Sequence, residues 1–188
     1  MQRGRLFILS GPSGSGKDSL LILSLPRVPN VRRCVTRTTR PIRPGEVAGA
    51  DYEFVSEDEF KRLIDEGDFL EWAIVHGCYY GTPLSTVRHM QADGLDVLLK
   101  IDVQGAEQVR GRLPEAITIF VNPPSREELE RRLRGRATET EEAVQHRLHD
   151  ALHEMELSVN YDYVVVNDDL DRCADELVTI LQTAQPTR

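Results

Sequence analysis

The chain has 188 residues, of which 40% are hydrophobic and 29% charged, and its formal net charge is −8. These proportions are ordinary for one globular domain, and the acidic balance argues against a nucleic-acid partner. No apolar run approaches about 20 residues, so we expect no membrane span or membrane partner.

The opening residues "MQRGRLFILSG" hold too short an apolar run for a signal peptide. Three scattered cysteines fit a reducing compartment and show no metal-site spacing. We therefore expect a cytoplasmic protein.

Strand and helix patterns alternate along most of the chain. The expected strands are 5–9, 32–35, 52–55, 69–75, 96–102, 116–121 and 163–166. The expected helices begin near Asp18 and continue over 57–66, 82–92, 104–112, 125–134, 139–157 and 170–183. A Pro-, Gly- and Arg-rich loop covers 36–52. This order predicts an α/β fold with a parallel sheet flanked by helices.

The segment 35–80 interrupts that alternation with several short strands and one helix. We therefore expect a single domain, 1–188, whose core is formed by 1–34 and 81–188, with 35–80 as an insertion.

The stretch "GPSGSGK", Gly11–Lys17, follows the apolar run "RLFIL" and opens a helix. Glycines let backbone N–H groups turn toward phosphate oxygens, the helix start adds positive potential, and a lysine reaches the outer phosphates. A sharp turn with an incidental lysine is the alternative. The position after the strand favours a phosphate-binding loop.

Two arginine clusters stand out in this acidic chain. Arg37, Arg40 and Arg43 lie in the irregular loop, either as solvated surface charges or as a second phosphate site, since guanidinium groups match phosphate geometry. The second cluster is the stretch "RRLRGR" with Arg147 further on. It is either a salt-bridged pair of helices or an arginine-rich lid. Such a lid neutralises a transferring phosphoryl group and excludes water. Two phosphate sites and a lid predict a kinase that acts on a phosphate.

Several blocks together resemble the guanylate kinase family over nearly the whole chain. They are "LFILSGPSGSGK", "TTRPIRPGEVAGADYEFVS", "FLEWAIVHGCYYGT", "IDVQGAEQVR", "RRLRGR" and "YDYVVVNDDLD". The resemblance implies a P-loop NTPase-type fold with a GMP-binding insertion at about 35–80 and a lid at about 132–147. It also implies transfer of the γ-phosphoryl of ATP to GMP, and to dGMP, with Mg²⁺ as cofactor.

The resemblance assigns residues to the acceptor. Two arginines and two tyrosine hydroxyls would hold the GMP phosphate, namely Arg40, Arg43, Tyr52 and Tyr80. Four polar side chains would read guanine, namely Thr36, Glu71, Thr82 and Asp102. A carboxylate accepts from the N1–H and exocyclic amine of guanine, and adenine offers no such pair of donors.

On the donor side the resemblance implies ATP binding by the loop and by one distant asparagine: Gly11, Pro12, Ser13, Gly14, Ser15, Gly16, Lys17, Asp18, Ser19 and Asn167. The implied catalytic cations are Lys17, Arg132, Arg136 and Arg147. The implied partners are the small molecules ATP and GMP, and we expect a monomer or a homodimer.

Two positions depart from the family pattern. Asp18 stands where a Ser or Thr usually reaches magnesium, and Lys100 stands where a second acid usually precedes Asp102. The loop "GSGKD" also resembles ribose 1,5-bisphosphate phosphokinases, which lack a full guanine-reading set. A catalytically inactive module that binds phosphorylated peptides is the other alternative, but such modules typically lose the ATP loop that Gly11, Gly16 and Lys17 preserve here.

We expect Asp18 and Lys100 to act as an exchanged pair: the acid has moved to the phosphate loop, and a base stands where an acid usually lies. Asp18 would then meet Mg²⁺ directly or through water. Independent substitutions, with Asp18 merely suiting the helix start, are the alternative. A double-mutant cycle with Asp18→Ser and Lys100→Asp, measured on kcat and magnesium dependence, tests this. A coupling energy below about 0.5 kcal/mol would show that the two residues act independently.

Overall fold

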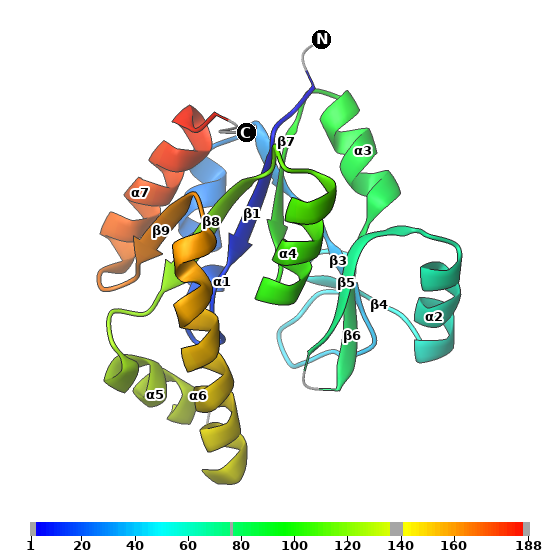
Figure 1. Ribbon diagram of the computed structural model, residues 1–188. Coiled ribbons are helices and arrows are strands. Elements are labelled where there is room, and N and C mark those ends of the chain that lie inside the picture. The colour runs from blue at the N-terminus through cyan, green and yellow to red at the C-terminus, as the bar shows by residue number, and fades with distance from the viewer. Residues whose placement is uncertain (1–2, 76, 136–140, 186–188) are drawn as a thin grey trace. The chain divides into compact units, whose positions relative to one another are not determined.

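The computed structural model describes residues 3–75, 77–135 and 141–185 (Figure 1). Its strands are β1 Leu6–Ser10, β2 Val31–Arg33, β3 Thr36–Thr38, β4 Tyr52–Phe54, β5 Phe69–Val75, β6 Cys78–Pro83, β7 Asp96–Lys100, β8 Ile117–Asn122 and β9 Tyr163–Val166. Its helices are α1 Lys17–Ser24, α2 Glu57–Asp65, α3 Leu84–Ala92, α4 Val103–Arg112, α5 Arg126–Arg134, α6 Glu141–Glu156 and α7 Leu170–Thr183, with short 3-10 turns η1 Leu25–Arg27 and η2 Leu157–Asn160. None of the helices in these described ranges is long and apolar enough to cross a membrane.

The larger sheet has the strand order β2-β7-β1-β8-β9, and its β2–β7 and β8–β9 pairings are parallel. Strands β1, β7 and β8 are buried over nearly their whole length, as expected for a parallel sheet covered by helices. The contacts divide the chain into two compact units, and each is described by itself below. The first contains 1–7 and 30–116, and the second contains 8–29 and 117–187.

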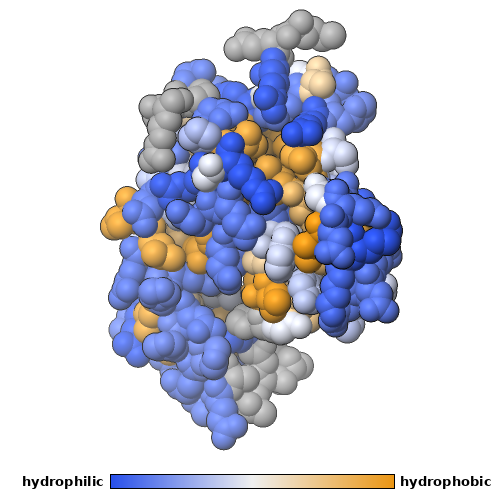
Figure 2. Space-filling view, turned by 45° about the vertical axis from the view of Figure 1, so that its right-hand side comes forward, coloured by the Kyte–Doolittle hydropathy of each residue, from blue (hydrophilic) through white to orange (hydrophobic). Residues whose placement is uncertain are grey.

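The first unit carries a second, four-stranded sheet with the order β4-β3-β6-β5. One face of it packs on α2, through a small core of Phe60, Leu63 and Phe69. Gly81 is required there, because a Cβ would lie 2.8 Å from the Phe69 ring and 2.9 Å from Phe60. The outer side of α2 is hydrophilic (Figure 2). The helix therefore covers this face of the sheet with its apolar side and exposes its polar side to solvent.

The second unit packs α7 against α1 and β9. A separate hydrophobic cluster joins α5 to α6 through Leu129, Leu133, Val144 and Leu148. The α5 and α6 helices therefore form a small module with its own core, and they carry Arg131, Arg132, Arg134 and Arg147.

Three local expectations were wrong. Thr36–Thr38 forms strand β3, although it was expected to lie in a loop, because β6 and β4 supply pairing partners on both sides. Thr82 and Pro83 end strand β6 rather than beginning a helix, and α3 starts at Leu84. Asp102 lies beyond β7 as the N-cap of α4, since its side chain accepts from the Gly105 N–H.

Candidate functional site

The strand register of the four-stranded sheet gathers five of the eight residues predicted to bind GMP. Residues paired directly across strands share a face, and residues two apart on a strand do too. Glu71 pairs with Thr82, Thr36 with Tyr52, and Thr38 with Tyr80. The side chains of Thr36, Tyr52, Glu71, Tyr80 and Thr82 therefore project from the face opposite α2.

Glu71 is the most unusual of these residues, because its carboxylate is buried at 2% exposure. Thr82 Oγ1 donates to Glu71 Oε1 at 2.5 Å. Burial raises the pKa of Glu71 to about 7, and the nearby Asp102 carboxylate adds to the shift while the Thr82 hydrogen bond opposes it. Such an acceptor is poised to take hydrogen bonds from a ligand that brings its own donors.

Asp102 lies close to the same carboxylate. A Cβ at Gly105 would lie 2.4 Å from Glu71 Oε2 and 3.2 Å from Asp102 Oδ1, so only glycine leaves room here. Burial also raises the pKa of Asp102, while the hydrogen bond from the Gly105 N–H opposes the shift. Two carboxylates thus meet at the start of α4.

Arg40 lies at the other end of this face and is 9% exposed. Its Nε donates to the Tyr80 hydroxyl at 3.2 Å, and its Nη2 donates to Glu46 Oε1 at 2.7 Å. Glu46 Oε2 also accepts from the backbone N–H of Arg43 at 2.8 Å, which ties the loop together. The Tyr80 hydroxyl, having accepted from Arg40, can still donate its own hydrogen to a phosphate.

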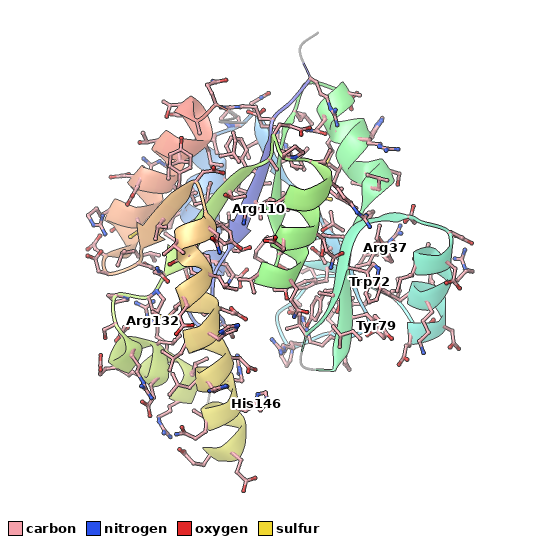
Figure 3. The ribbon with its side chains drawn as sticks, viewed as in Figure 1. Arg37, Trp72, Tyr79, Arg110, Arg132 and His146 are labelled. Atoms are coloured by element: carbon pink, nitrogen blue, oxygen red, sulfur yellow. The ribbon has the colours of Figure 1, made fainter. Side chains whose placement is uncertain are left out.

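Lys100 contributes a second cation near Tyr52. Its Nζ lies 5.2 Å from the Tyr52 ring centroid, and the Arg40 guanidinium carbon lies 5.3 Å from the same ring. Arg37, by contrast, lies on the α2 side with Trp72 and Tyr79 (Figure 3). It pairs there with Glu53 and Asp68. Arg37 is therefore a structural cation of the sheet.

The phosphate-loop residues lie in the second unit. Gly14 and Gly16 adopt φ values of 89° and 94°, which favour glycine. Lys17 Nζ donates to the carbonyls of Gly11 and Pro12 at 2.6 and 2.9 Å. The Ser15 hydroxyl oxygen is buried without a hydrogen-bond partner among the described residues. A lysine folded over a glycine-rich turn is the arrangement expected of a phosphate cradle.

Three of the predicted donor-side residues contact this loop. Asn167 Nδ2 donates to the Ser15 carbonyl at 2.7 Å. Arg132 Nη1 donates to the same carbonyl at 3.5 Å, and its Nη2 donates to the Asn167 carbonyl at 3.1 Å. Arg147 Nη2 donates to Ser13 Oγ at 2.5 Å. A side chain at Gly16 would be strained, because its φ is 94° and a Cβ would lie 2.1 Å from Asn167 Nδ2, which would have to move.

The sequence did not reveal the carboxylates that hold these cations. Glu128 accepts from Arg132 Nε at 2.7 Å and from Arg131, and these hydrogen bonds lower its pKa to about 2. Glu46 likewise accepts a hydrogen bond from Arg40. The only available signal was the spacing of acids near arginines, which solvated surfaces also show.

Arg136 lies outside the described residues, as does part of the predicted lid. Asp18 is exposed in the first turn of α1. Within the described ranges no group of three or more His, Cys, Asp or Glu side chains is placed to hold a metal ion. The Asp18–Lys100 pairing and the boundaries of insertion and lid stay predictions.

A buried strand, a glycine-rich turn and a lysine folded onto that turn define a P-loop nucleotide-binding protein of the α/β class. The family model for guanylate kinase matches residues 3–184. The chain belongs to the guanylate kinase family, a family of nucleotide-binding kinases, and the resemblance seen in the sequence is confirmed.

Individual relatives agree over the whole length. A guanylate kinase of Rubrobacter xylanophilus is 50% identical over 182 residues, which cover 97% of this chain and 95% of that protein. A guanylate kinase of Neisseria gonorrhoeae is 48% identical, with 100% and 91% covered. The crystal structure of guanylate kinase from Anaplasma phagocytophilum matches with a TM-score of 0.79 at 37% identity, over 96% of this chain and 86% of that one. The expected fold class is therefore confirmed.

The burial of Glu71 predicts a pH-dependent stability. Its folded pKa of about 7 lies above the ordinary 4.5, so its contribution to stability is present below 4.5 and is lost as the pH rises through 7. Glu71→Gln cannot ionise, and its free energy of unfolding should exceed that of the wild type by up to about 3 kcal/mol at pH 9 but not at pH 4.5. Urea unfolding at both pH values measures this, with the exposed Glu107→Gln as control. A difference in unfolding free energy between Glu71→Gln and the wild type that is the same at both pH values would contradict the prediction.

Proposed function

We propose that the protein transfers the γ-phosphoryl group of ATP to GMP, and to dGMP, giving ADP and the corresponding diphosphate. The observation that carries the proposal is the buried Glu71 carboxylate, held by Thr82 on the sheet face that also presents Arg40, Tyr52 and Tyr80. Guanine supplies the N1–H and amine donors that a buried carboxylate lacks.

In this proposal the base and the phosphate of GMP have separate binding groups. Glu71, Asp102, Thr36 and Thr82 read guanine. Arg40, Arg43, Tyr52 and Tyr80 hold the phosphate, since two guanidinium groups and two neutral donors can surround a dianion. The exposed Arg43, with its backbone fixed by Glu46, can turn its side chain toward the arriving phosphate.

The donor site consists of the loop residues 11–19 with Asn167. Lys17 holds the outer phosphates, and Arg132, Arg147 and Arg136 stabilise the charge on the transferring group. The contacts of Arg132 and Arg147 with the loop support this role, because they place both guanidinium groups beside the phosphate cradle.

Magnesium fits the residues present. Mg²⁺ usually takes one or two carboxylates and completes its shell with phosphate oxygens and water. Asp18 is an exposed carboxylate directly after Lys17 and would supply that ligand. When bound, Mg²⁺ neutralises charge on the transferring phosphates.

On this proposal the enzyme works in the cytoplasm, as a monomer or homodimer, on small-molecule nucleotides and without a nucleic-acid or membrane partner.

A coupled assay with ATP and four acceptors tests the reaction: GMP, dGMP, AMP and ribose 1,5-bisphosphate. Losing a buried, paired carboxylate contact costs roughly 2–5 kcal/mol, so kcat/KM for GMP should exceed that for AMP by about 30-fold or more. Equal values for GMP and AMP would rule the proposal out. A preference for ribose 1,5-bisphosphate would favour a ribose 1,5-bisphosphate phosphokinase. No phosphorylation of any of the four acceptors would favour a catalytically inactive module that binds phosphorylated peptides.

The phosphate-holding role predicts a selective change in KM. Arg40→Ala and Arg43→Ala should raise the KM for GMP more than the KM for ATP, because both belong to the acceptor site. Arg37→Ala is the matched control: its guanidinium pairs with Glu53 and Asp68 on the opposite face. It should lower thermal stability without raising the KM for GMP. An effect of Arg40→Ala or Arg43→Ala on ATP alone would show that the assignment is wrong.

A further inference from the structure

Helix α4 takes the place of a neighbouring strand along the edge of the four-stranded sheet. Strand β5 is the last strand in the order β4-β3-β6-β5, and α4 packs against it (Figure 1). The outward N–H and C=O groups of an edge strand need partners when they are covered. Gln108 supplies both for Trp72: its Nε2 donates to the Trp72 carbonyl at 2.6 Å, and its Oε1 accepts from the Trp72 N–H at 3.3 Å.

The contact extends along one face of α4. Arg112 Nη1 donates to the carbonyls of Phe69 and Leu70 at 3.2 and 2.6 Å. Gly105 meets the Glu71 carboxylate itself, where a Cβ would lie 2.4 Å away. Positions 105, 108 and 112 share a helix face, as the spacing of three and four residues requires. Both peptide neighbours of Glu71 are therefore fixed by one helix.

The second carboxylate of the site belongs to this same helix. Asp102 is the N-cap of α4 and accepts from the Gly105 N–H at 3.0 Å. The helix thus holds Asp102 through its own first turn and Glu71 through the backbone of β5. The distance between the two carboxylates is set by how α4 is fastened to β5.

We propose that Gln108 is a positioning residue for base recognition: it fixes Glu71 relative to Asp102 and so determines selectivity for a purine with a 2-amino group. This inference rests on the proposed function. Guanine presents two adjacent donors, N1–H and the 2-amine, whereas hypoxanthine presents N1–H alone. A misplaced Glu71 loses one contact with guanine that hypoxanthine never makes.

The rival interpretation is that Gln108 only satisfies an edge strand and stabilises the fold. The two interpretations differ in what they predict for substrate ratios. A loss of folded protein lowers the activity toward every acceptor equally, so the ratio of kcat/KM for GMP and IMP, measured on one preparation, does not depend on the folded fraction.

The test compares Gln108→Met with wild type. Methionine keeps the length of the side chain and removes both hydrogen bonds to Trp72. The KM for GMP should rise about tenfold, the size expected from one or two lost hydrogen bonds. The KM for ATP should stay the same, and the GMP-to-IMP ratio should fall by a similar factor. Glu107→Gln is the control, because Glu107 lies on the exposed side of α4 and its carboxylate pairs with Arg110. It should change neither the KM for GMP nor the ratio.

An unchanged GMP-to-IMP ratio in Gln108→Met would overturn the inference, whether or not total activity falls. Failure of the proposed function looks different, since the wild type itself would then show no preference for GMP over AMP.

Discussion

The four-stranded sheet of the first unit and helix α4 are organised around one constraint, the burial of the Glu71 carboxylate. A buried carboxylate is costly unless hydrogen bonds or charges compensate it, and burial raises the pKa of Glu71 to about 7. Thr82 supplies one donor, and the glycine at position 105 opens the space beside the second oxygen. The remaining acceptor capacity is left for a ligand. With the proposed role of Glu71, part of the free energy of folding is given up at this position in return for selectivity.

Unlike the Glu71 carboxylate, the main cations of the two units are paired with opposite charges within the protein. Arg40 is held by Glu46 and Arg132 by Glu128, so each guanidinium group is already paired within the protein. In a chain of net charge −8, these pairs are compatible with the proposed phosphate sites, because the acids orient the arginines and leave other N–H donors for a ligand. A pair with a fixed geometry also loses less conformational freedom when phosphate binds.

Much of this arrangement could be predicted from the sequence, because its signals are local. The phosphate loop has a motif, and the buried strands β1, β7 and β8 have continuous apolar runs. Strand β6 was missed because Gly81 and Pro83 are poor strand formers, and because one of its two partners, β3, is distant in the chain. The role of Gln108 could not be predicted, since it binds backbone atoms of Trp72 that only the folded chain brings near it. The role of Glu46 was missed although its partners are near in the chain, because an acid close to arginines is equally typical of a solvated surface. Side chain to backbone contacts leave no periodic pattern.

Strand register determines which side chains form the proposed acceptor site. The β5–β6 pairing contains an irregularity between Phe69 and Glu71, and beyond it Glu71 lies opposite Thr82. Bulges of this kind re-aim side chains and recur beside functional sites. A slip of one residue would turn Glu71 toward the α2 core and bring Trp72 to the substrate face, because side chains alternate between faces. The polar contacts from α4 to Phe69, Leu70 and Trp72 bracket the irregularity and oppose such a slip. In the proposed acceptor site, base selectivity thus depends on residues that need never touch the base.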